Sequence, residues 1–168
     1  ELPKSPNSLR LTLWVLLIVY IFNFLDRQIV NILAEPISRD LGLSDTQIGL
    51  MTGIAFAAFY TFLGIPIARY ADRPKTNRVG LISVSLIIWS GMTALCGVAQ
   101  NFVQLLLARI GVGVGEAGCT PAAHSLIADL APPEKRASAI SFYSLGIPIG
   151  SLLGMVIGGL IADAYGWR

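Results

Sequence analysis

Long apolar stretches separated by short polar ones dominate the chain. Residues 46–68, 79–108 and 137–162 contain no Asp, Glu, Lys or Arg, and residues 11–25 form a further uncharged stretch. A helix needs about 20 apolar residues to cross roughly 30 Å of hydrocarbon. Gln100 and Asn101 interrupt the longest stretch, which predicts a turn there. Because the segments lack the alternation of barrel strands, the pattern predicts five transmembrane helices, over about residues 11–34, 46–69, 78–99, 102–129 and 135–163.

Residues that start or stop helices stand between these stretches. Pro36 is expected to end the first helix, because proline lacks the backbone N–H and its ring clashes with the preceding turn. Ser44 or Asp45 can cap the second helix. Pro132 and Pro133 are expected to separate the fourth helix from the fifth.

The composition supports a membrane protein and excludes other classes. Hydrophobic residues make up 54% of the 168 residues and charged residues only 13%, against about 25% charged in soluble domains. A soluble enzyme and a disordered chain are both excluded. The single His and the lack of a nucleophile motif predict no catalytic residue, metal site or cofactor. The net charge of +2 gives no nucleic-acid footprint. Cys96 and Cys119 fall inside predicted spans and are expected to be buried thiols.

Lys and Arg lie mainly on one side of the predicted helices. Eight fall in the N-terminal tail and in the second and fourth connections: Lys4, Arg10, Arg69, Arg73, Lys75, Arg78, Lys135 and Arg136. Arg39 and Arg168 lie on the other side. By the positive-inside rule, the tail (residues 1–10) is expected in the cytoplasm of a multi-pass integral membrane protein.

Four charged residues fall inside predicted spans: Asp26, Arg27, Arg109 and Glu116. A charge at mid-membrane costs about 2.5–3.5 kcal/mol on the insertion scale, so such residues usually pair and mark a pathway. Arg109 and Glu116 are seven residues apart, which places them on one helix face about 10 Å apart. Asp26 is expected at the depth of Arg109. We therefore predict an Asp26–Arg109–Glu116 cluster in a polar cavity, or alternatively a structural ion pair between the first and fourth helices.

A buried carboxylate without a full partner can bind and release a proton near neutral pH, as a coupling site requires. Arg27 points about 100° away from Asp26 and either extends toward the membrane surface or caps an outer cavity. His124 lies on nearly the same face as Glu116, where it either carries protons or packs. Three glycines beside these charges either let a substrate approach or let the helix pack: Gly111, Gly113 and Gly115.

Glycine recurs every fourth residue in the fifth predicted helix, at Gly146, Gly150 and Gly154, around Pro148. Small residues at this spacing allow two helix backbones to approach closely in lipid. Proline removes a backbone hydrogen bond and permits a bend. The combination predicts a hinge at an interface that slides or rocks.

Three segments together resemble a known family. Residues 109–117 (RIGVGVGEA) resemble the helix-4 motif of the major facilitator superfamily, and residues 68–73 (ARYADR) resemble its loop between helices 2 and 3. Residues 146–150 (GIPIG) resemble the helix-5 motif of its antiporters. Within the superfamily, residues 24–27 (FLDR) and 113–117 (GVGEA) look like the Spinster branch.

The resemblance implies an all-α, major-facilitator-type helical bundle, of which this chain matches a partial N-terminal half. The family has twelve helices in two halves, so the chain is expected to be the first portion of a longer protein and to pack against the remaining helices. The Spinster branch implies a transporter of an amphipathic lipid by alternating access, coupled to protons, in a bacterial inner (plasma) membrane among membrane lipids. An organic-anion symporter, with Arg109 binding a carboxylate, and a structural or accessory membrane protein stay open as alternatives.

The resemblance also implies a latch on the cytoplasmic side, formed by Asp72, Arg73 and Asp129 with the participation of Arg78. Two departures from the family pattern affect it. Ala68 replaces the usual glycine, and the basic residues after Arg73 are shifted to Lys75 and Arg78. The base that contacts Asp129 is therefore left open.

Overall fold

The structure, a computed structural model, describes residues 6–168, with side chains from Ser8 onward. Within this range every regular element is helical, and five helical segments have the length and apolar composition to cross a membrane: Ser8–Leu41, Asp45–Ala71, Arg78–Gly97, Phe102–Leu130 and Pro133–Tyr165. The predicted all-α fold with five spans is confirmed. The predicted tail, residues 1–10, lies partly outside the described residues, and its remainder belongs to the first helix.

The five segments contain seven α-helices, one short π-helical turn and one short 3₁₀ turn. Leu50–Ile54 is a π-helical turn between α2 and α3, and Pro133–Lys135 is a 3₁₀ turn before α6. The α-helices are α1 Pro6–Leu41, α2 Asp45–Gly49, α3 Ala55–Ala71, α4 Arg78–Gly97, α5 Phe102–Leu130, α6 Arg136–Ser144 and α7 Gly146–Tyr165.

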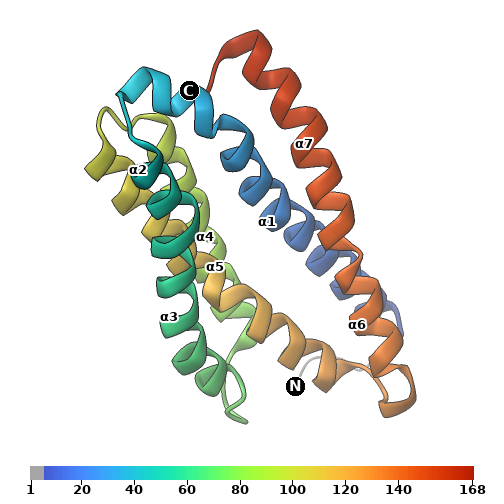
Figure 1. Ribbon diagram of the computed structural model, residues 1–168. Coiled ribbons are helices and arrows are strands. Elements are labelled where there is room, and N and C mark those ends of the chain that lie inside the picture. Colours follow the sequence, from blue (N-terminus) through green and yellow to red (C-terminus); the bar gives the residue numbers. More distant parts are fainter. Residues whose placement is uncertain (1–5) are drawn as a thin grey trace.

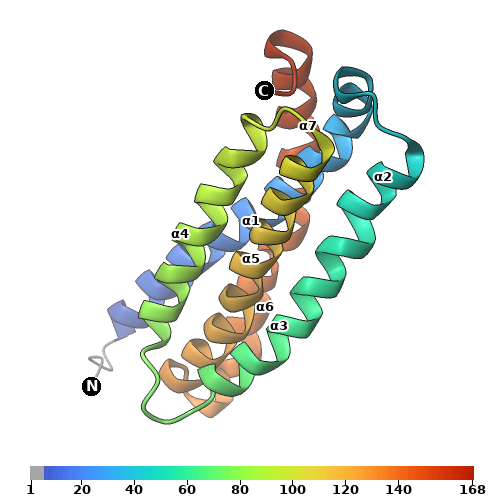
Figure 2. The same cartoon turned by 90° about the vertical axis from the view of Figure 1, so that its left-hand side faces the viewer.

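The helices form two groups (Figure 1, Figure 2). In one group α1 packs along α6 and α7, and in the other α5 packs between α3 and α4, whereas α1 touches α5 less extensively. The start of α1 and the α3–α4 and α5–α6 connections lie at one end of the bundle, here called the Asp129 end. The C-terminus and the α1–α2 connection lie at the other, here called the Asp40 end.

The glycine stripe of α7 forms the contact with α1. Gly146, Gly150, Gly154 and Gly158 are all buried. A Cβ atom at Gly150 would lie 2.3 Å from the carbonyl oxygen of Ile21 on α1, closer than real Cβ atoms approach. The predicted close approach is therefore present, and α6 is separated from α7 at Leu145, three residues before Pro148.

The glycines of α5 also serve helix packing. A Cβ atom at Gly115 would lie 2.6 Å from the backbone nitrogen of Trp89 on α4, and one at Gly111 would lie 2.6 Å from the Met92 side chain. Gly113 instead faces Phe56 of α3. Of the two roles left open by the sequence, the structure supports packing, and this close contact makes α5 the most buried helix.

The expectation that Pro36 ends the first helix was wrong, because α1 continues to Leu41. Pro36 is exposed, while Ile37 beside it is buried in an apolar cluster that favours the continuing helix. Gly42 ends the helix instead. Its positive φ of 63° is a left-handed conformation that glycine adopts without strain.

Ser44 caps the following helix, one of the two residues predicted to do so. The backbone N–H of Gln47 donates to the Ser44 hydroxyl oxygen at 3.3 Å, and the Ser44 backbone N–H donates to the Gln47 side-chain oxygen at 2.9 Å. This reciprocal capping box satisfies two N–H groups that a helix start leaves unpaired.

The α1–α7 contact predicts a contrast between two glycines of α7. Gly150→Ala should destabilise the full-length protein by about 1–3 kcal/mol, because the new methyl group must displace the α1 backbone. Gly159→Ala is the matched control, since a Cβ atom there would meet no described atom within 4 Å apart from its chain neighbours and the backbone of its own helix. Thermal unfolding in detergent should show a lower Tm for Gly150→Ala and an unchanged or higher Tm for Gly159→Ala. Equal Tm values would contradict the packing account.

Candidate functional site

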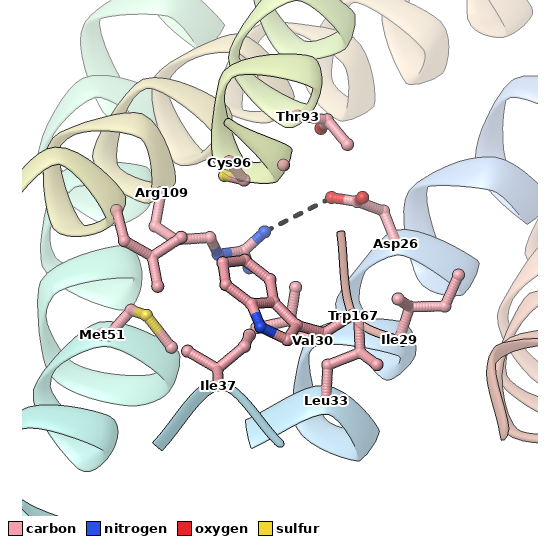
Figure 3. A pocket seen from close by; sticks show the side chains of 12 residues that line it. Asp26, Ile29, Val30, Leu33, Ile37, Met51, Thr93, Cys96, Arg109 and Trp167 are labelled. Carbon is pink, nitrogen blue, oxygen red and sulfur yellow. Dashed lines mark hydrogen bonds and ion pairs between the residues drawn. The ribbon is translucent and has the colours of Figure 1, made fainter. Parts of the chain in front are cut away.

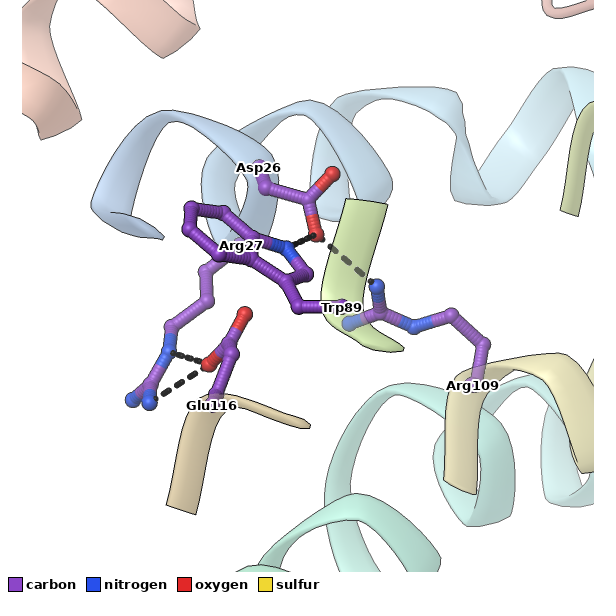
Figure 4. Close-up of polar contacts among 5 residues, drawn as sticks. All are labelled: Asp26, Arg27, Trp89, Arg109 and Glu116. Atoms are coloured by element: carbon purple, nitrogen blue, oxygen red, sulfur yellow. Dashed lines mark hydrogen bonds and ion pairs between the residues drawn. The ribbon is translucent and has the colours of Figure 1, made fainter. Parts of the chain in front are cut away.

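The four charged residues predicted within spans lie together where α1 faces α5. Arg109 on α5 donates from Nη1 to Oδ2 of Asp26 on α1 at 3.4 Å (Figure 3). Arg27 on α1 donates to Oε2 of Glu116 on α5 from both Nη2, at 2.7 Å, and Nε, at 2.8 Å (Figure 4). The site thus consists of two ion pairs, each linking the same two helices.

The Asp26–Arg109 part of the predicted cluster is present, as an ion pair between the first and fourth predicted helices. The place of Glu116 is a correction, because Glu116 pairs with Arg27 and not with Arg109. Seven residues along a helix rise about 10 Å, too far for one guanidinium to contact Asp26 and Glu116 together. Asp26 and Arg27 diverge by about 100° around α1, so each reaches a different turn of α5. Arg27, for which the sequence left the direction open, points into the bundle.

The four side chains differ in their access to water. The Glu116 side chain is 0% exposed and that of Arg27 is 29% exposed, whereas Arg109 and Asp26 are 4% and 13% exposed. In these four side chains, two buried atoms have no hydrogen-bond partner among the described residues, Oε1 of Glu116 and Nε of Arg109. Because an unpaired buried polar atom is costly, these two atoms mark where a proton or a ligand can bind.

Aromatic rings surround the guanidinium of Arg27. Its Cζ atom lies 5.3 Å from the ring centre of Phe24, 5.1 Å from that of Phe56 and 4.9 Å from that of Tyr60. Arg109 also lies over Phe56, at 5.2 Å. Cation–π attraction therefore holds both arginines near one ring. The sequence analysis missed these residues, although Phe56 and Tyr60 are four residues apart and so share a helix face.

Trp89 on α4 is a second contact that the sequence analysis missed. Its indole N–H donates to Oδ2 of Asp26 at 3.3 Å, the same oxygen that accepts from Arg109 (Figure 4). Trp89 is buried. Trp89 lies in a long stretch without charged residues. Nothing in the sequence around it therefore indicates that its indole N–H contacts a carboxylate.

A cavity of about 330 Å³ opens beside Arg27 and Arg109, here called the Arg27 pocket. Both arginines line it, which gives it a positive character. Polar side chains of α1, the π turn and α3 complete its wall, and those that can hydrogen-bond are Asn31, Thr52, Tyr60 and Thr61. The arrangement suits an anionic group accompanied by hydroxyl or carbonyl oxygens.

His124 lies apart from the charged site. Its side chain is exposed, and its ring packs edge-on against Tyr143, with ring centres 5.4 Å apart. Tyr143 in turn stacks on Tyr20 at 4.2 Å. The His124 ring thus makes a packing contact between α5 and α6.

At the Asp129 end, Arg78 forms an ion pair with Asp129 and donates from Nε to the Ser125 hydroxyl at 2.7 Å. The base that contacts Asp129 is thus Arg78, on α4. Asp72 and Arg73 are exposed at the end of α3, with Arg73 over the Tyr70 ring at 5.7 Å. No ion pair is found for either residue within the described part of the chain.

Within residues 6–168, no group of three or more His, Cys, Asp or Glu side chains is placed to hold a metal ion. Cys96 and Cys119 are free thiols, and Cys119 is buried while Cys96 is only partly so. The chemistry of the site is therefore that of its two ion pairs and the adjoining pocket.

The chain is similar in fold and in sequence to known proteins. The chain is 47% identical to a bacterial homologue of the human lysosomal transporter Spinster, solved in an inward-facing and occupied conformation, with a TM-score of 0.89 over 95% of this chain and 34% of that one. It is 42% identical to an MFS-type efflux pump of Mycolicibacterium smegmatis, over 92% of this chain and 35% of that protein.

Two further relatives carry names that differ in substrate. The hexuronate transporter of Bacillus subtilis is 32% identical, over 88% of this chain and 34% of that protein. The sphingosine-1-phosphate transporter SPNS2 of Danio rerio is 29% identical, over 87% of this chain and 29% of that protein. The chain thus spans about a third of the length of these relatives. The sequence profile of the Major Facilitator Superfamily matches residues 16–168, and the chain belongs to that superfamily.

Proposed function

We propose that the protein containing this chain is a secondary transporter, not an enzyme, that moves an anionic amphipathic lipid by alternating access and couples this movement to protons. Its lipid would be a lysophospholipid or a sphingolipid-like molecule. Superfamily membership and the similarity to a Spinster homologue support the transporter class. The similarity to a sphingosine-1-phosphate transporter supports a lipid that carries a negative head group.

The Arg27 pocket supports an anionic head group. Arg27 and Arg109 both line it and present guanidinium groups, which bind phosphate or carboxylate with charge-assisted hydrogen bonds. Arg27 is the more accessible of the two, at 29% exposed. In our proposal the head group binds Arg27 first.

An organic-anion symporter is the second candidate. A sugar acid also combines a carboxylate with hydroxyl groups, and Thr52, Tyr60 and Thr61 in the pocket wall can bond such hydroxyls. The similarity to a hexuronate transporter supports this candidate. Both candidates use the same two arginines, so the class of substrate has to be decided by binding.

The observation that carries the coupling proposal is the environment of Glu116. Its side chain is fully buried, one oxygen accepts from Arg27, and the other oxygen has no partner among the described residues. A substrate that draws Arg27 into the pocket leaves the Glu116 charge unpaired, and a buried unpaired carboxylate favours its neutral form. Glu116 would then take up a proton, and release of the substrate would return Arg27 and expel that proton.

We further propose that the Asp129 end faces the cytoplasm of a bacterial plasma membrane. The α3–α4 and α5–α6 connections, which carry most of the chain's loop Lys and Arg residues, both lie at that end (Figure 1).

Asp72 and Arg73 would be the part of the latch that contacts the remaining helices, because neither has an ion-pair partner within the described residues. The Arg78–Asp129 pair would hold α4 to α5 next to this latch. The break between α6 and α7, with the stripe Gly146, Gly150 and Gly154 near Pro148, would be the hinge.

Glu116→Gln should abolish accumulation driven by a pH gradient while preserving folding and substrate binding, because glutamine mimics the protonated carboxyl group. Asp26→Asn should give a weaker defect, since the 3.4 Å contact of Asp26 with Arg109 is longer than the Arg27–Glu116 contacts. Uptake into vesicles with an imposed pH gradient measures both. Glu35→Gln, on the exposed face of α1, is the matched control. A Glu116→Gln protein that still responds fully to the gradient would refute the coupling assignment.

Arg27→Gln should weaken substrate binding by about 10- to 100-fold, the range expected for losing a hydrogen bond to a charged group. Arg39→Gln, on the exposed end of α1, should bind normally. Titration of the purified full-length protein with a lysophospholipid and with a hexuronate measures the effect for each class. The proposal expects the lysophospholipid to bind, and binding of the hexuronate alone would establish the organic-anion candidate instead.

A further inference from the structure

A second cavity lies beside the charged site and is distinct from the Arg27 pocket. It has a volume of about 150 Å³ and is bounded toward the Asp40 end by Trp167, so it is here called the Trp167 cavity (Figure 3). Asp26 lines this cavity and not the Arg27 pocket, whereas Arg27 lines only the Arg27 pocket. Arg109 is the one residue common to the two described linings, so it separates them.

The Trp167 cavity has apolar walls and a polar floor. Ile37 and Met51 are among its buried walls, while Asp26, Thr93 and Arg109 supply its polar groups. Arg109 is 3% exposed, and its Nε and the Thr93 hydroxyl oxygen both lack a hydrogen-bond partner among the described residues. A cavity of this size with unpaired polar atoms has room for a few water molecules that satisfy them.

Asp26 is arranged to take a proton from such water. Arg109 and Trp89 both donate to its Oδ2 atom, which leaves Oδ1 for a proton. The charged groups near it from α5 are Arg109 and Glu116, while Arg27 of its own helix is directed to Glu116 and α4 contributes the uncharged Trp89 N–H. Transfer of a proton from hydronium to Oδ1 would leave water behind and would free Arg109.

The bond that holds Trp167 over the cavity lies near solvent. The Trp167 indole N–H donates to Oδ2 of Asp40 at 3.0 Å, and Arg168 Nη2 donates to the same oxygen at 2.8 Å. The Arg168 guanidinium also covers the Trp167 ring at 4.4 Å. Asp40 and Arg168 are 48% and 45% exposed, and such surface pairs contribute little to stability. These polar contacts therefore hold Trp167 only weakly, and its partly buried ring also packs against the apolar cluster of Ile37, Met51 and Leu105.

We infer that the Trp167 cavity is a water-filled antechamber through which protons reach Asp26 from the Asp40 end, and that Trp167 is its lid. Protons would then enter by a route that does not cross the Arg27 pocket, so a bound substrate does not obstruct them. This inference rests on the proposed proton coupling, and it adds Asp26 as a second carboxylate that a proton reaches, beside Glu116 as the coupling residue.

Cys96 provides a test of the lid that does not require transport, because its thiol lines the Trp167 cavity. The full-length protein would carry Cys119→Ser, with any cysteine outside this chain also replaced, and would be treated with a membrane-impermeant thiol reagent from the Asp40 side. Trp167→Ala should raise the rate of Cys96 modification at least tenfold. Trp167→Phe, which keeps an aromatic ring, should raise it much less. Equal rates for the parent protein and a folded Trp167→Ala variant, judged by its Tm, would overturn the inference.

A pH jump tests whether the cavity conducts protons. After acidification on the Asp40 side, protonation of Asp26 should change the fluorescence of Trp89, which donates to its carboxylate. The change should be faster with Trp167→Ala than with Trp167→Phe and absent with Asp26→Asn, each in a Trp14→Phe background. Equal rates, or a response that survives Asp26→Asn, would overturn the proton route. Loss of pH-driven uptake in vesicles tests the coupling proposal separately, since Cys96 modification needs no substrate.

Discussion

The burial of four ionisable side chains between α1 and α5 is the constraint on which the rest of this structure depends. Removing an ion from water costs several kcal/mol even after the protein relaxes, so each buried charge requires a partner at close range. Asp26 and Arg27 extend from adjacent positions of α1, and Arg109 and Glu116 extend from two different turns of α5. Since α1 touches α5 less extensively than it touches α7, the two ion pairs help to fix how the α1–α6–α7 group meets the α3–α4–α5 group, together with a buried apolar cluster that joins Leu16 and Tyr143 to α5.

The two pairs differ in a way that suits separate tasks. Arg27 is partly exposed, borders the Arg27 pocket and has three aromatic rings around it, so it can exchange a carboxylate inside the protein for an anionic ligand. Asp26 borders the Trp167 cavity instead. Arg109 stands between the two cavities. A ligand on one side and a proton on the other can thus act on one charged network without sharing a route.

Much of the fold follows from the sequence because its signals are local. Uncharged stretches define the spans, and the glycine spacing in α7 predicts its close contact with α1. Pro36 was misjudged because its effect depends on the exposure of its ring and on the packing of Ile37, which are tertiary properties. The presence of the four charges was equally visible. Their pairing was not, because helical periodicity gives the direction of Arg27 relative to Asp26 but not the rotation of α1 against α5. The contact of Trp89 with Asp26 depends on a third helix and has no local signal.

The central claim is that Glu116 is paired with Arg27 and not with Arg109. A double-mutant cycle on the thermal stability of the full-length protein tests it, using Arg27→Gln, Arg109→Gln and Glu116→Gln singly and in pairs. Contacting ion-pair partners show interaction energies of about 0.5–3 kcal/mol, whereas independent sites are additive within about 0.5 kcal/mol. The account predicts clear non-additivity for Arg27 with Glu116 and near-additivity for Arg109 with Glu116. Stronger coupling of Glu116 to Arg109 than to Arg27 would contradict it.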